Sequence, residues 1–161
     1  MKKYFKLIIV MLIFVLCVGG LTIRKKQIMH DRLESQVLLF ETEFYNTVLT
    51  AEEAVNDMDT VALKDCRDKL TVLQEDIQLE QDEARDETVI ALYSELNTMV
   101  SYYSEMLLVV SDVVNNPWNL LTGMPDEVID NILQKLEEHS DKYNEYKQEL
   151  EIETSNHLEN L

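Results

Sequence analysis

The side chains that most often perform chemistry are scarce in this chain of 161 residues, which has three histidines and two cysteines. None of His30, His139 and His157 stands three residues after a glutamate, so the Glu-x-x-His pair of di-iron helical bundles does not occur. The His-Glu-x-x-His and Cys-x-x-Cys motifs are also missing. Three glycines offer no phosphate-binding loop. We therefore expect no catalytic residue, no metal site and no cofactor, and hence a protein that is not an enzyme.

The isolated reactive residues lie where packing explains them. His139 and His157 fall on the apolar stripe of the last predicted helix, which favours an interior or rim histidine over a metal ligand. Cys66 lies on another apolar stripe, so we interpret it as a small buried hydrophobe rather than a nucleophile. An acidic cluster lacks the spacing of an EF-hand; it could hold a cation loosely or face Arg24, Lys25 and Lys26. This cluster comprises Glu80, Asp82, Glu83, Asp86 and Glu87.

Charge divides the chain into two parts. The chain has 14 basic and 31 acidic residues and a net charge of −17. Six basic residues and no acidic ones lie in residues 1–26, so residues 27–161 hold eight basic and 31 acidic residues, a balance of −23. A body this acidic is a poor partner for phosphates, which excludes nucleic acid. We predict two parts, a basic and apolar segment over residues 1–26 and an acidic body over residues 27–161.

The first part has the composition of a membrane anchor. Residues 7–23 contain no charge, and with Tyr4 and Phe5 the segment approaches the about 20 residues that span a bilayer. We predict that residues 4–23 contact the lipid bilayer. The predicted anchor residues are Leu7, Ile8, Ile9, Val10, Met11, Leu12, Ile13, Phe14, Val15, Leu16, Val18 and Leu21. The alternatives are a signal peptide cleaved near Gly20, which would give a secreted body, a lipidated Cys17, or a buried core helix.

The orientation of the body follows from the short N-terminal tail. Positive residues flank the apolar segment on both sides, so the count of basic residues does not decide the orientation. A short tail with three lysines usually stays in the cytoplasm, and a strongly acidic body is easier to place away from the anionic cytoplasmic leaflet. We therefore predict a single-pass protein of the cell membrane with an extracytoplasmic body.

The body shows four apolar stripes with steps of three and four residues, which are typical of amphipathic helices. They are Leu33, Val37, Phe40, Phe44, Thr47, Ala51, Val55 and Met58; Leu63, Cys66, Leu70, Leu73 and Ile77; Val89, Leu92, Leu96, Met99, Tyr103, Met106, Val110 and Val113; and Ile129, Ile132, Leu136, His139, Tyr143, Tyr146 and Leu150, with the last period reaching His157 and Leu161. The opposite faces are acidic, for example Glu75, Asp76, Gln78 and Glu80, or Glu137, Glu138, Asp141 and Glu145, and we interpret them as solvated.

Polar breaks separate these helices. Residues 56–60 form one break, Asp86 is a good N-cap for the third helix, and residues 115–117 end it at a proline. Pro125 is a natural first position for the fourth helix. We predict an all-α protein, in which an N-terminal transmembrane helix or signal segment precedes an antiparallel up-down four-helix bundle with long helices. The 56–60 turn and the 115–125 connection then share the membrane-distal tip.

The distal connection contains more apolar residues than most loops do. Its apolar residues close the bundle end as a plug or form a partner-binding tip, in which the only tryptophan would be an anchor. The candidate tip residues are Pro117, Trp118, Leu120, Leu121 and Met124.

Two functions remain open on the sequence. The first is a non-enzymatic, membrane-anchored scaffold, adaptor or accessory subunit, which contacts a protein partner or a second copy of itself. The alternative is a bundle that senses a small ligand or ion and signals through a partner protein. It would need an interior pocket, and Tyr103, Tyr143 and Tyr146 are the candidate polar lining.

Overall fold

The computed structural model describes residues 30–116 and 124–150, and these residues form helices and turns with no strand. Contacts within the chain divide it into two compact units, residues 1–38 and 39–161. A helix covers residues 30–56, of which 30–38 belong to the first unit and 39–56 to the second. No helix in the described ranges is long and apolar enough to cross a membrane. The predicted anchor, residues 1–26, lies outside the described residues.

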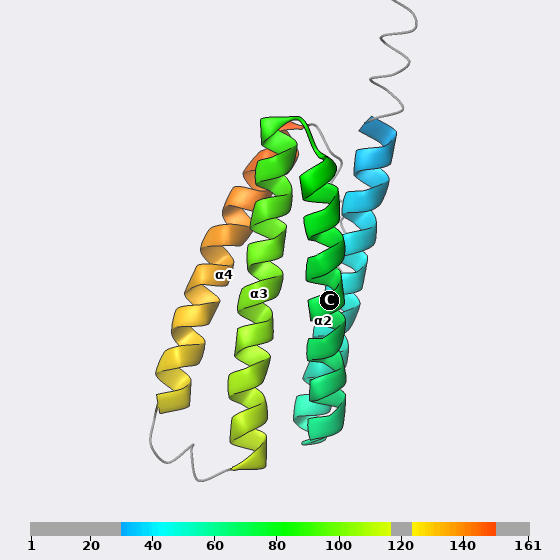
Figure 1. The fold of residues 1–161 in the computed structure, drawn as a ribbon. Coiled ribbons are helices and arrows are strands. Elements are labelled where there is room, and N and C mark those ends of the chain that lie inside the picture. Colours follow the sequence, from blue (N-terminus) through cyan, green and yellow to red (C-terminus); the bar gives the residue numbers. More distant parts are fainter. Residues whose placement is uncertain (1–29, 117–123, 151–161) are drawn as a thin grey trace, which may run out of the picture. The chain divides into compact units, whose positions relative to one another are not determined.

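The second unit continues with α2 (Thr60–Glu83), α3 (Glu87–Asn115) and α4 (Met124–Glu149). Successive helical segments of this unit run in alternating directions (Figure 1). Contacts join α2 to α3 and α3 to α4. The predicted all-α fold with four helices is thus confirmed for the described residues, and the arrangement is consistent with a four-helix bundle. The end of α3 and the start of α4 lie at the same end as the turn between residue 56 and α2 (Figure 1).

Aspartate side chains begin α2 and α3. The carboxylate of Asp59 accepts hydrogen bonds of 3.0 Å from the backbone N–H groups of Val61 and Ala62. The predicted cap Asp86 does the same for Thr88 and Val89, at 2.9 and 3.2 Å. These contacts satisfy donors that the first turn of a helix otherwise leaves unpaired. At the other helix ends, α3 stops at Asn115 as predicted, and α4 begins at Met124, one residue before the predicted Pro125.

The predicted stripes match the buried residues best in the shortest helix. All five stripe residues of α2 are buried. In α3, Leu92, Leu96 and Tyr103 are buried as predicted. Five other stripe residues are only half-buried: Val89, Met99, Met106, Val110 and Val113. Tyr93, Val100 and Leu107 are buried instead. A strict seven-residue repeat drifts by about 20° per heptad around a straight helix. Over the 29 residues of α3 this drift turns a predicted narrow stripe away from the interior.

Aromatic side chains from the first helix (residues 30–56) meet α3 across the interior of the second unit. Phe40 lies edge-on to Tyr93 with ring centres 6.1 Å apart. Phe44 lies edge-on to Tyr103 at 5.7 Å. Such edge-to-face pairs bury large apolar areas and add about 0.5–1.5 kcal/mol beyond that burial. The interior at these positions is therefore filled by side chains.

The prediction that Met58 belongs to the first apolar stripe is wrong. Met58 follows the end of the first helix and is 74% exposed, with a positive φ of 55°. Its N–H donates to the carbonyl of Val55, and the N–H of Asp59 donates to the carbonyl of Ala54. This is the hydrogen-bond pattern of a Schellman motif, whose left-handed position usually holds glycine. The helical period ends before Met58 because the chain reverses there.

We expect Met58→Gly to stabilise the protein by roughly 0.5–1 kcal/mol. Glycine removes the cost of holding a side chain in the left-handed region, which exceeds the entropy that glycine adds to the unfolded chain. Urea unfolding of the full chain in mild detergent, followed by circular dichroism, measures the change. Met58→Ala keeps the Cβ atom and is the matched control, so equal stabilities of the two variants would contradict the explanation.

Candidate functional site

The predicted anchor and most of the predicted tip lie outside the described residues. All the predicted anchor residues precede residue 30, and Pro117, Trp118, Leu120 and Leu121 lie between α3 and α4 in the range that is not described. Met124 is the first residue of α4. The membrane anchor and the partner-binding tip therefore remain predictions. The described surface is that of the helices and the turns between them.

The tyrosines proposed to line a ligand pocket occupy a packed interior. Tyr103 is buried against Phe44, and burial, with help from the carboxylate of Glu52, raises the pKa of Tyr103 to about 12. Tyr143 is buried and Tyr146 is half-buried on α4. None of the three lines either of the two grooves described below.

A buried polar cluster joins the first helix to α4. The Lys147 ammonium donates to Oε1 of Glu41 at 2.6 Å, and the Tyr143 hydroxyl donates to the same oxygen at 3.1 Å. Lys147 is 2% exposed and the Glu41 side chain is 27% exposed. Burial, and then the nearby Glu41 carboxylate, raise the pKa of Tyr143. Sequence reasoning missed Lys147, although its place four residues after Tyr143 puts both on one helix face.

A second polar cluster joins α3 to α4 nearer the surface. A hydrogen bond of 2.5 Å joins Nδ1 of His139 to Oε2 of Glu95, and both side chains are partly exposed. The ring of Tyr102 lies 5.5 Å from that of His139, and the Lys135 ammonium lies 5.1 Å from the centre of the Tyr102 ring. Of the two positions predicted for His139, interior or rim, the structure shows a partly exposed residue that is hydrogen-bonded to Glu95. Among the described residues, no three His, Cys, Asp or Glu side chains are grouped so that they could hold a metal ion.

Cys66 and two residues of the predicted acidic cluster have structural roles in the described part of the chain. Cys66 is a free cysteine that is 1% exposed, as predicted, and burial raises the pKa of its thiol. In the predicted acidic cluster, Asp86 caps α3 and Asp82 accepts a hydrogen bond from Gln78. Neither arrangement prepares a nucleophile or an acid–base pair.

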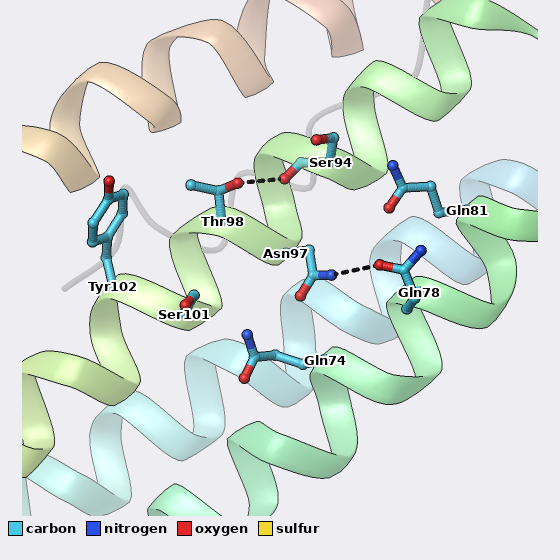
Figure 2. Close-up of a pocket in the computed structure, with 8 residues that line it drawn as sticks. All are labelled: Gln74, Gln78, Gln81, Ser94, Asn97, Thr98, Ser101 and Tyr102. Atoms are coloured by element: carbon cyan, nitrogen blue, oxygen red, sulfur yellow. Dashed lines mark hydrogen bonds between the residues drawn. The ribbon is translucent and has the colours of Figure 1, made fainter.

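An open groove runs between α2 and α3 (Figure 2). Its volume is about 480 Å³, and every residue that lines it is polar and uncharged. The lining residues are Gln74, Gln78 and Gln81 from α2, and Ser94, Asn97, Thr98, Ser101 and Tyr102 from α3. The Asn97 amide donates to Oε1 of Gln78 at 3.3 Å and links the two helices. Gln78, predicted to lie on the acidic face of α2, lines this uncharged groove, and its amide donates to the neighbouring carboxylate of Asp82.

A second groove of about 570 Å³ adjoins the first and shares Gln74, Gln78 and Asn97 with it. It adds Thr71, Glu75 and the 64% exposed Leu79. We call the lining of both grooves the α2–α3 face. Glu75 is its only charged residue. Such a surface offers hydrogen-bond donors and acceptors without acid–base or ionic chemistry.

The signal for this face was present in the sequence. Gln74, Gln78 and Gln81 are spaced by four and three residues, and so are Ser94, Thr98 and Ser101, which puts each set on one face of its helix. Asp82, four residues after Gln78, borders the α2 row and accepts a hydrogen bond from the Gln78 amide.

Comparison with known proteins gives no relative, because no protein-family model, no curated protein and no solved structure matches the chain. The function must therefore be argued from the chain's own residues.

The buried cluster predicts unequal effects of removing its two charges. Glu41→Ala leaves the Lys147 cation buried without its partner, and we expect a loss of about 2–4 kcal/mol in unfolding free energy. Lys147→Met leaves Glu41 partly in water and bound by Tyr143, so we expect a loss of about 1 kcal/mol or less. Urea unfolding of the two variants measures the difference. Equal losses, or the reverse order, would contradict the assignment of Lys147 as the costlier charge to leave unpaired.

The buried tyrosines predict a loss of stability at alkaline pH. A tyrosine in the unfolded chain loses its proton near pH 10, whereas folded Tyr103 keeps it up to about pH 12. The contribution of Tyr103 is therefore complete below pH 10 and is lost as pH rises from 10 to 12. Unfolding free energies measured between pH 9 and 12 should fall, and less steeply in Tyr103→Phe. An identical slope in that variant would exclude Tyr103 as a cause.

Proposed function

We propose that the chain is a non-enzymatic, membrane-anchored helical protein that works as a scaffold, adaptor or accessory subunit through protein–protein contacts. In this proposal residues 4–23 form the anchor and the acidic body lies outside the cytoplasm. The uncharged run over residues 7–23 and its basic flanks support the anchor. The short lysine-bearing tail supports the orientation.

The observation that best supports action through protein contacts is the α2–α3 face. The chain carries a net charge of −17, yet Glu75 is the only charged residue among those that line this face. Depletion of charged residues is the compositional signal that distinguishes the centre of a protein interface from the rest of a surface. The exposed Leu79 adds an apolar contact at the same place.

The sensing bundle, our alternative, has less support. A sensing bundle needs an interior pocket. Of its candidate lining residues, Tyr103 is buried against Phe44 and Tyr143 is hydrogen-bonded to Glu41. The described residues offer open grooves on a surface rather than an enclosed site. An open groove suits another macromolecule better than a small ligand, which binds where most of its surface is buried.

Topology can be tested with a membrane-impermeant maleimide on intact cells. In a Cys17→Ser background, Cys66 is 1% exposed and serves as the silent internal thiol. We expect Asn131→Cys, on the exposed side of α4, to be labelled in intact cells, and Trp118→Cys to be labelled there as well. The labelled protein should sediment with membranes.

Each other outcome removes one part of the proposal. Labelling of Asn131→Cys only after lysis would place the body in the cytoplasm. Labelled protein in the medium would show a cleaved signal peptide. If the Asn131→Cys variant were labelled and the Trp118→Cys variant were not, the connection between α3 and α4 would be a plug at the bundle end. The hypothesis of a partner-binding tip would then be discarded.

A further inference from the structure

We propose that the α2–α3 face is where two copies of this chain meet in a symmetric dimer. The proposal rests on the proposed function, since it names the partner and the surface of a protein that acts through contacts. A two-fold dimer uses the same surface on both copies, so that surface must be complementary to itself. Electrostatics, helix geometry and hydrogen-bond chemistry each favour this face.

Repulsion between acidic chains restricts where two copies can touch. Residues 27–161 carry a balance of −23, and the exposed side of α4 presents Glu137, Glu138, Asp141 and Glu145. A contact through α4 would place carboxylates of one copy against those of the other, which costs several kcal/mol in a desolvated interface. Among the lining residues of the α2–α3 face, Glu75 is the only carboxylate, and the carboxylate of Asp82 at its border is hydrogen-bonded to the Gln78 amide.

The membrane fixes the direction of the symmetry axis. Two copies anchored in one bilayer with the same orientation are related by an axis along the membrane normal, which is parallel to the helices if the bundle stands upright. Rotation about that axis places α2 of one copy opposite α3 of the other and preserves height along the helices. The long row of Gln74, Gln78 and Gln81 then faces the short row of Ser94, Thr98 and Ser101. The glutamine row of each copy thus packs against the row of small side chains on the other copy, and the two-fold axis repeats this contact twice in the dimer.

The hydrogen-bond chemistry of the two rows is compatible with this pairing. Amides and hydroxyls both donate and accept, so each can pair with the same kind of group on a second copy, whereas two carboxylates cannot.

The register of the contact follows from the hydrogen bond between Asn97 and Gln78, which sets these residues at one height. Because α2 and α3 are antiparallel, Gln74 and Ser101, each four residues further along the same direction in space, are also level (Figure 2). In the dimer, Gln74 of one copy therefore faces Ser101 of the other.

The first test is a charge placed in the contact. Full chain purified in mild detergent should show concentration-dependent dimers by light scattering coupled to size-exclusion chromatography. Ser101→Glu should raise the dissociation constant by about ten-fold or more, because it brings two further carboxylates into the interface. Asn131→Glu adds the same charge to the exposed side of α4 and should change the dissociation constant of the dimer by less than about two-fold. Circular dichroism checks that both variants are folded.

The second test does not depend on the folding of a charged variant. Two differently tagged full chains, one with Gln74→Cys and one with Ser101→Cys, are co-expressed in a Cys17→Ser background and oxidised mildly in their membranes. A mixed disulfide between the two tags is expected. The pair of Gln74→Cys with Asn131→Cys is the matched control and should give none.

Two results would overturn the dimer. One is a chain that stays monomeric over the whole concentration range. The other is crosslinking of the control pair as strongly as the test pair. In either case the proposed function stands if the impermeant label still places Asn131→Cys outside the cell, and it falls if that label shows a cytoplasmic body.

Discussion

Each of the four helices in the described residues has an apolar stripe on one side, so none of them can remove its apolar surface from water alone. This constraint explains the arrangement of the second unit. The stripe of α2, from Leu63 to Ile77, is completely buried, and the aromatic pairs of Phe40 with Tyr93 and Phe44 with Tyr103 reach across the interior. A filled interior leaves the outer surfaces as the place for function. What the protein does must therefore be sought in how those surfaces differ from one another.

Charge is the main difference between the surfaces. An excess of acidic residues keeps most faces solvated and makes contact between like-charged faces costly. The α2–α3 face is uncharged apart from Glu75, and it exposes Leu79. Its amides join α2 to α3 through the hydrogen bonds of Asn97 with Gln78 and of Gln81 with the carbonyl of Ile90, in addition to the packing of the buried stripes. The departure of this face from the charge of the surrounding surface is the observation on which we base the proposal of contact with another macromolecule.

Much of the fold could be predicted from local signals. Asp86 and the break at residues 56–60 mark helix starts because capping chemistry is local, and the α2 stripe is short enough for any helical period to fit. Met58 was misassigned because its spacing continues the helix while its backbone turns into the left-handed region. Lys147 could not be found from hydrophobicity, because its burial depends on Glu41, which lies 106 residues away in the sequence. The α2–α3 face needed the pairing of two helices before its polar rows formed one surface.

The Lys147–Glu41 pair also contributes to specificity of packing. Apolar stripes with similar spacing tolerate sliding by one helical turn, because leucine and isoleucine fit many neighbours. A shift of α4 by one turn would separate the Lys147 ammonium, which is 2% exposed in the observed packing, from Glu41, and breaking a buried ion pair is costly. Tyr143 reinforces the same register, since its hydroxyl binds the same oxygen of Glu41. The interior stripes thus make the helices associate, and this polar cluster determines the register in which α4 packs on the first helix.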